Sequence, residues 1–144
     1  MAKPKEKNTK AGKPMHFSVG ALIERDGKYL LIERAVPPLG FAGVAGHIDE
    51  GEDERQAVIR EVKEEVGFDV NDPKLLFEEE LDGNWCSKGA TSHYWYLFHC
   101  PVSGEMERSE RETKSVGWYS KEEIKKMILE PAWEYWFRKL GILS

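Results

Sequence analysis

The stretch "GHIDEGEDERQAVIREVKEEVGF", residues 46–68, decides the fold of this 144-residue chain. It opens with a turn that is rich in glycine and acidic residues, up to Glu52. From residue 53 to residue 66 the apolar residues recur with helical spacing, and Gly67 is well placed to end a helix in a left-handed cap. The stretch therefore predicts an acidic loop that leads directly into a helix.

The apolar residues of this helix share one side. With about 100 degrees between successive residues, Val58 lies at 0, Val62 at about 40 and Val66 at about 80 degrees. Ile59 follows at about 100 degrees and extends the stripe. We expect these four residues to face the protein core.

Three glutamates occupy the neighbouring arc of the same helix. Glu64, Glu61 and Glu65 fall at about 240, 300 and 340 degrees, where like charges three or four residues apart destabilise a helix by a few tenths of a kcal/mol per pair. Solvent and the adjacent Arg60 and Lys63 offer one explanation. A hard divalent cation, Mg²⁺ or Mn²⁺, offers another, because such ions prefer carboxylate oxygens.

The spacing of the glutamates by itself does not favour the cation, but the sequence around them resembles a known motif that does. Gly46 is followed by five residues, Glu52, seven residues and then the run REVKEEVGF at residues 60–68. At every defined position this resembles the Nudix box: glycine, five residues, glutamate, seven residues, Arg-Glu, an aliphatic, any residue, Glu-Glu, any residue, glycine, and an aliphatic or aromatic residue. Just before the box, where many members have Pro-Gly-Gly, this chain has Val-Ala-Gly, which affects loop stiffness more than chemistry.

The resemblance implies a fold, an activity and a metal site. Nudix hydrolases use divalent cations and water to cleave the diphosphate bond of a nucleoside diphosphate linked to another group, such as a nucleoside triphosphate or an ADP-ribose-like compound. By resemblance, Glu52 and Arg60 form a structural pair that orients the acidic side chains. The implied ligands of Mg²⁺ or Mn²⁺ are the carbonyl of Gly46 and the carboxylates of Glu61, Glu64 and Glu65. A nucleotide-sensing module with the same fold and no catalysis is the alternative.

Two further roles follow from the same resemblance. The general base is Glu61 or a glutamate of the acidic loop at residues 105–112, namely Glu105, Glu107, Glu110 or Glu112. Arg34 resembles the arginine that several members direct at substrate phosphates, for which its forked guanidinium is suited; a surface ion pair with Glu33 is the alternative. Phe41 is a candidate for stacking on a base, as are Trp85, Tyr94, Trp95 and Tyr96, although in residues 94–98 both alternating faces are apolar, which favours core packing.

The rest of the chain predicts strands and two more helices. Residues 16–24 and 28–33 read as a β-hairpin around Asp26-Gly27, and further strands are expected at 41–45, 75–81, 93–100 and 115–119. Ser120 and Glu123 form a capping box for a helix through residue 129, and Pro131 suits the first turn of a last, aromatic helix. This order predicts an α/β protein, a Nudix-type α/β/α sandwich with a mixed central sheet.

Charge and composition limit the partners. Residues 1–14 contain five lysines and one glutamate and are expected to be a basic disordered tail; the other 16 basic and 25 acidic residues give residues 15–144, the predicted Nudix hydrolase domain, a net charge of −9. That charge repels a phosphate backbone, so a nucleic acid partner is disfavoured and a small nucleotide is expected. Pairing of two chains as a homodimer is left open.

Membrane insertion and a zinc site of the cysteine type are not expected. No run approaches the roughly 20 apolar residues that span a bilayer, and the N-terminal residues lack an apolar signal core, which together predict a cytoplasmic protein. The two cysteines, Cys86 and Cys100, show no CxxC or His/Cys spacing of a zinc site. Neither His93 nor His99 has a recognisable partner in the sequence.

Overall fold

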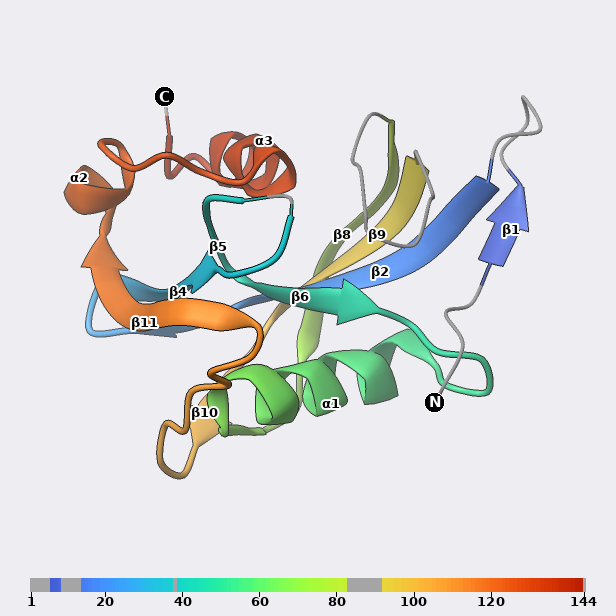
Figure 1. Cartoon of the computed structure of the whole chain (residues 1–144), viewed down its shortest axis with the longest axis horizontal. Helices are drawn as coiled ribbons and strands as arrows, with labels where there is room; N and C mark the ends of the chain where they lie inside the picture. The colour runs from blue at the N-terminus through green and yellow to red at the C-terminus, as the bar shows by residue number, and fades with distance from the viewer. Residues whose placement is uncertain (1–5, 9–13, 38, 83–91, 144) are drawn as a thin grey trace.

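Two β-sheets lie between helices in the computed structural model, which describes residues 6–8, 14–37, 39–82 and 92–143 (Figure 1). The larger sheet is built around β2 (Pro14–Leu22), which pairs in parallel with β9 (Ser92–His99). The remaining strands of this sheet are antiparallel to their neighbours and are β1 (Glu6–Asn8) and β6 (Val44–His47) beside β2, and β8 (Lys74–Asp82) beside β9.

The smaller sheet is antiparallel and centred on β4 (Lys28–Arg34). Its other strands are β11 (Thr113–Ser120), β3 (Glu24–Arg25) and β5 (Phe41–Ala42). A separate short pair, β7 (Asp69–Val70) with β10 (Val102–Ser103), lies beside the C-terminal end of the first helix.

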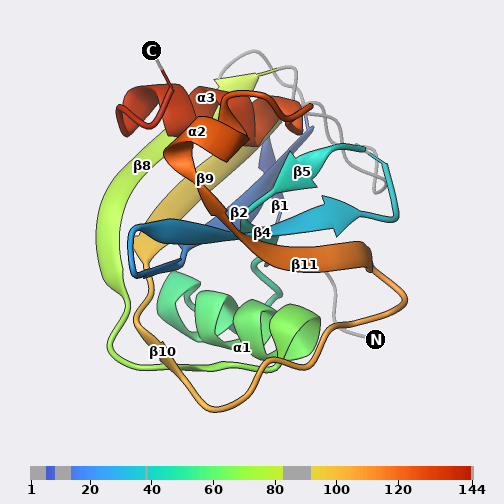
Figure 2. The ribbon, with the colours of Figure 1, turned by 90° about the vertical axis from the view of Figure 1, so that its left-hand side faces the viewer.

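The helices form the outer layers. Helix α1 (Glu54–Val66) covers one side of the sheets, and α2 (Lys121–Ile124) with α3 (Pro131–Lys139) covers the other, as Figures 1 and 2 show. Pro131 stands in the first turn of α3, and Trp133, Trp136 and Phe137 are buried against the sheet. The expected α/β/α sandwich with a mixed sheet is confirmed.

The predicted hairpin is wrong in its longer part. Only Glu24 and Arg25 pair with β4 across the Asp26-Gly27 turn, whereas residues 14–22 belong to the other sheet. Both segments have the same alternating pattern, and pattern alone does not specify a pairing partner. Strand β2 instead pairs with β9, more than 70 residues away in sequence.

Three other boundaries differ from the sequence prediction. Helix α2 ends at Ile124 rather than residue 129, because the backbone of residues 128 and 130 hydrogen-bonds with Phe41 instead. The expected strand at 41–45 is divided at Gly43, where a β-carbon would overlap the ring of Trp133. Within the predicted tail, Glu6–Asn8 is strand β1, and the other residues up to 13 lie outside the described residues.

Candidate active site

Helix α1 is fixed at both ends by local hydrogen bonds. At its start, Asp53 and Gln56 form a reciprocal capping box, and at its end Gly67 has a φ of 80°, with its N–H donating to the carbonyl of Lys63. The acidic loop then packs on this end: the N–H of Glu107 donates to the carbonyl of Val66 at 2.7 Å. The loop that carries the candidate bases is therefore held against the box helix.

The buried face of α1 is not centred where the apolar residues predict. Val58, Val62 and Val66 are buried as expected, but Ile59 is 38% exposed. Glu61 and Glu65 are buried instead, at 9% and 3% exposure. The prediction for Ile59 is wrong because the helix turns its carboxylates toward the larger sheet and the acidic loop, which together bury about half of its circumference.

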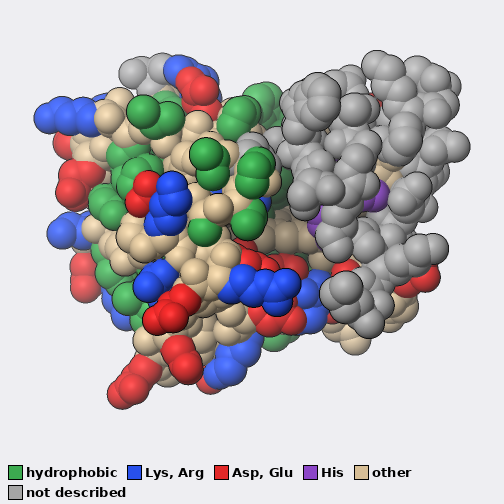
Figure 3. All heavy atoms as spheres, in the orientation of Figure 1, with side chains coloured by type: hydrophobic (Ala, Val, Ile, Leu, Met, Phe, Trp, Pro, Cys, Tyr) green, Lys and Arg blue, Asp and Glu red, His purple; other side chains and the backbone are tan. Residues whose placement is uncertain are grey.

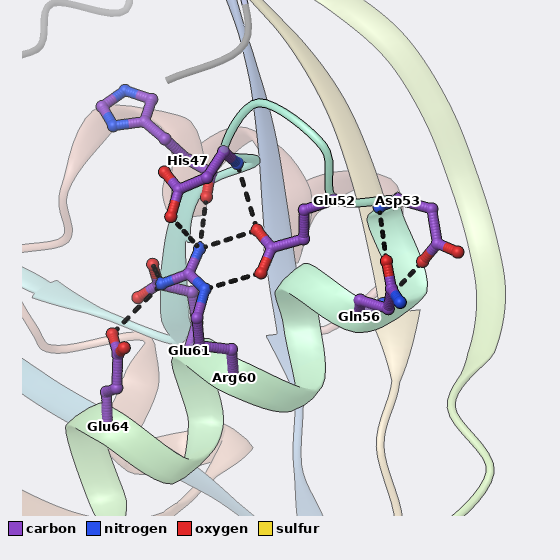
Figure 4. Close-up of polar contacts among 8 residues, drawn as sticks. His47, Glu52, Asp53, Gln56, Arg60, Glu61 and Glu64 are labelled. Atoms are coloured by element: carbon purple, nitrogen blue, oxygen red, sulfur yellow. Dashed lines mark hydrogen bonds and ion pairs between the residues drawn. The ribbon is translucent and has the colours of Figure 1, made fainter. Parts of the chain in front are cut away.

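Arg60 joins the loop to the helix. Its Nε and Nη2 donate to the two carboxylate oxygens of Glu52 at 2.8 and 3.0 Å, and Nη2 also donates to the carbonyl of His47 at 2.9 Å (Figure 4). Nη1 donates to Glu61 at 2.8 Å and to Glu64 at 3.1 Å. The pair of Glu52 and Arg60 implied by the box spacing is thus present, and it gathers two of the three glutamates.

Gly46 makes room for a carboxylate. It lies in β6, opposite Val19 of β2, and a β-carbon at this position would overlap the carboxylate of Glu61. Any larger residue would push Glu61 away from the strand. This close approach brings together two of the residues that the box assigns to the metal site.

Burial places two carboxylates in an unfavourable environment. It raises the pKa of Glu61 to about 7, against the opposing effect of Arg60. The pKa of Glu65 is raised further above its usual range, first by burial and then by the negative charges of Glu61 and Glu112. Among the described residues, Oε2 of Glu65 is buried without a hydrogen-bond partner. Arg60 and Arg34 offset the charge of these carboxylates only in part, and a hard divalent cation would supply the rest, so the donor set fits Mg²⁺ or Mn²⁺.

The acidic loop contributes one of its four candidate glutamates to this cluster. The charge of Glu112 acts on both Glu61 and Glu65. The charge of Arg34 also acts on the cluster, since it lowers the pKa of Glu65. Arg34 pairs in register with Thr113, the residue after Glu112. The parts of the site therefore come from α1, β6, the end of β4 and the end of the acidic loop.

The family model described as the NUDIX domain matches residues 14–140. This chain belongs to the Nudix hydrolase family. The match extends the assignment from the 23 residues of the box to nearly all of the described structure.

Relatives and solved structures agree with a Nudix pyrophosphohydrolase. The CTP pyrophosphohydrolase of Escherichia coli K12 is 32% identical over 123 residues, which cover 79% of this chain and 82% of that protein. The crystal structure of a MutT NUDIX hydrolase from Burkholderia pseudomallei superimposes with a TM-score of 0.70 and 28% identity, covering 84% of this chain and 94% of that one. Putative nudix hydrolase 1 of Caenorhabditis elegans is 31% identical over 83 residues. These residues cover 56% of this chain and 20% of that protein.

The candidate aromatic residues of this Nudix domain differ in their surroundings. Phe41 is half-buried, lies edge-on to Tyr119 at 5.9 Å, and shares backbone hydrogen bonds with residues 128 and 130. Trp95 is buried beneath α3, as core packing predicts, and Trp85 lies outside the described residues.

In the described part of the chain, no helix is both long enough and apolar enough to cross a bilayer.

Proposed function

We propose that this Nudix domain hydrolyses a nucleoside triphosphate in the presence of Mg²⁺ or Mn²⁺, with CTP as the first candidate. The products are the nucleoside monophosphate and inorganic diphosphate. The observation that carries the proposal is the pair of buried carboxylates on α1, Glu61 and Glu65, of which Glu61 lies against Gly46. The name of the E. coli relative, which this chain covers over most of its length, supports CTP over an ADP-ribose-like compound.

The residues of the box would hold the cation. Glu61, Glu64 and Glu65 supply carboxylate oxygens, and Gly46 supplies a backbone carbonyl. When bound, the cation would offset the charge of the substrate phosphates and lower the pKa of the attacking water. The fork of Arg60 keeps Glu61 and Glu64 near one another, and Glu52 holds that fork by two hydrogen bonds.

We assign the acceptance of the water proton to one of two carboxylates. Glu61 is one, and Glu112 is the member of the acidic loop whose charge reaches Glu61 and Glu65. Oxygen of the water forms a bond with phosphorus, the bridging P–O bond breaks, and the proton moves to the carboxylate. The leaving group departs as the diphosphate.

The substrate is oriented by residues of the smaller sheet. The charge of Arg34, at the end of β4, lowers the pKa of Glu65, which supports our assignment of its guanidinium to a substrate phosphate beside the cation. Phe41 lies on β5, in register with Glu33, the neighbour of Arg34. We assign the ring of Phe41 to stacking on the base.

A substrate panel tests the proposal. The protein is incubated with CTP, the other nucleoside triphosphates and ADP-ribose in Mg²⁺, and the nucleotide and phosphate products are separated and measured. Glu64→Gln and Glu65→Gln keep the side-chain size and remove the charge, so each should lower the rate at least a hundredfold, roughly 3 kcal/mol at the transition state. Glu122→Gln, an exposed acid on α2, is the control and should not change the rate.

Three results would contradict the proposal in whole or in part. Unchanged turnover in both box variants would remove the metal assignment. Binding of CTP with no product across the whole panel would instead support the nucleotide-sensing module. A preference for ADP-ribose would retain the hydrolase and overturn the substrate.

A further inference from the structure

Three of the four histidines of the chain converge on one end of the larger sheet. His16, His47 and His93 each offer a ring nitrogen, and these nitrogens all lie within 4.8 Å of one another. The ring centroids are 4.9, 5.6 and 6.0 Å apart. His16 and His93 are buried, and His47 is half-buried. No role in the proposed hydrolysis uses these rings.

The register of the sheet explains the convergence. His16 of β2 stands directly beside His93 of β9 in the parallel pair. His47 of β6 stands opposite Ser18, which is two residues from His16 and therefore on the same face. Three strands far apart in sequence thus direct their histidines to the same side of the sheet.

This face is not the one that carries the carboxylates. Gly46 and His47 are successive residues of a strand, so their side-chain positions point to opposite faces. At Gly46 that direction leads to Glu61 of α1. In Figure 4 the ring of His47 points away from Arg60 while its carbonyl faces Arg60. On the histidine face, His93 instead neighbours Trp95, which packs beneath α3.

The donor set selects a different class of metal from that of the glutamates. Imidazole nitrogen suits Zn²⁺ and the later transition metals, whereas Mg²⁺ requires oxygen. Three histidines with one open position are a known zinc arrangement, with Zn–N bonds of about 2.0–2.1 Å and therefore ring nitrogens about 3.3 Å apart. Zn²⁺ binding would therefore require the imidazole rings to rotate and close the difference from 4.8 Å.

We propose that His16, His47 and His93 form a Zn²⁺ site that is separate from the carboxylate site of the Nudix box. The ion would link β2, β6 and β9 and leave one coordination position open to water or an anion. Because the carbonyl of His47 accepts a hydrogen bond from Arg60, the ion would also fix the start of the loop between β6 and α1. A chain of imidazole hydrogen bonds without a metal is the competing arrangement.

Metal titration of the untagged, metal-stripped protein tests the site. Zn²⁺ is titrated against a chromogenic chelator in a large excess of Mg²⁺, which occupies oxygen sites but not imidazole. One Zn²⁺ should bind per chain and should raise the melting temperature, since a ligand of the folded state stabilises it. Co²⁺ at the same site should give the intense visible absorption of a four-coordinate ion rather than the weak absorption of an octahedral one.

Matched variants identify the ligands. His16→Gln, His47→Gln and His93→Gln should each weaken Zn²⁺ binding at least a hundredfold. His99→Gln, which changes the fourth histidine on the same strand β9 but outside the cluster, should bind as the native protein does. Thermal unfolding without metal shows whether each variant is folded. If the buried positions 16 and 93 do not tolerate glutamine, Zn²⁺ binding by the native protein and by the variant at the half-buried position 47 tests the site.

Three outcomes would overturn the proposal. The first is the absence of saturable Zn²⁺ binding by the native protein in excess Mg²⁺, which would favour the metal-free imidazole chain. The second is equal binding by the native protein and the folded variants at positions 16, 47 and 93. The third is an octahedral Co²⁺ spectrum. None of these readouts depends on CTP hydrolysis.

Discussion

Raising the pH in the absence of divalent cations should destabilise this protein. The reason is the burial of Glu61, whose pKa of about 7 in the folded protein compares with 4.5 when unperturbed. Between those values the folded state holds a proton that the unfolded state has released. The contribution of Glu61 to the free energy of unfolding is therefore fully present below pH 4.5 and is lost as the pH rises through 7.

The size of this effect follows from the two pKa values. One tenfold change in proton affinity corresponds to about 1.4 kcal/mol, so ionising Glu61 in the folded protein costs roughly 3 kcal/mol more than in the unfolded chain. Integrated from pH 5 to pH 8, the loss of stability is roughly 2.5 kcal/mol. For a domain of this size that corresponds to a fall in melting temperature of roughly 5 to 10 °C. The raised pKa of Glu65 acts in the same direction.

Thermal unfolding with a chelator at pH 5 and pH 8 measures the loss. Glu61→Gln is the matched variant, because glutamine can still accept the hydrogen bond from Arg60 but does not titrate. The lowered pKa of Glu52, which arises from its hydrogen bond with Arg60, makes an opposite contribution that native protein and variant share. The difference between the two proteins therefore reports the titration of Glu61 together with its effect on the pKa of Glu65.

Adding Mg²⁺ completes the experiment. At pH 8 it should restore most of the lost stability of the native protein, because a cation compensates the buried charges, and at pH 5 it should have little effect. The reasoning is refuted if native protein and Glu61→Gln lose the same stability between pH 5 and pH 8. It is refuted equally if Mg²⁺ leaves the melting temperature of the native protein at pH 8 unchanged.

Two further predictions concern the loops on either side of α1. Arg60→Lys should lower the free energy of unfolding by about 1–3 kcal/mol in chemical denaturation, because lysine cannot form the forked hydrogen bonds to Glu52. Arg55→Lys on the same helix, where the ion pair is exposed, is the control and should change the free energy of unfolding by less than about 0.5 kcal/mol. Gly67→Ala should destabilise the protein more than Gly27→Ala in the same assay. Both glycines have a positive φ, but only at Gly67 would a β-carbon meet the backbone of Glu107, at 2.7 Å. Equal losses of stability would show that the acidic loop moves away from a β-carbon without destabilising the protein.

The amino-acid sequence determined the local features of the box helix. The spacing of Val58, Val62 and Val66 predicted one buried stripe, and Gly67 predicted the left-handed end. Such features depend on residues within a few positions of each other, where helical geometry fixes which side chains are neighbours. The pair of Glu52 and Arg60 was reached through the resemblance to the Nudix box rather than through helical spacing.

Tertiary packing decided which carboxylates are buried and which distant residues join them. Helical periodicity states that Glu61 and Glu65 share a side, but only the position of β6 and the acidic loop places that side in the interior and exposes Ile59. The same holds for Glu112: four glutamates of the loop were equivalent in sequence until the loop folded onto the end of α1.

The histidine cluster shows the limit most clearly. His16, His47 and His93 have no spacing that predicts a metal site, and they meet only because β2 pairs in parallel with β9 and antiparallel with β6. The sequence predicted β2 as half of a hairpin, a pairing under which these three rings would not have met. Local spacing could specify the helix, whereas strand pairing depends on contacts between segments that are far apart in the chain, so it was decided only by the folded structure.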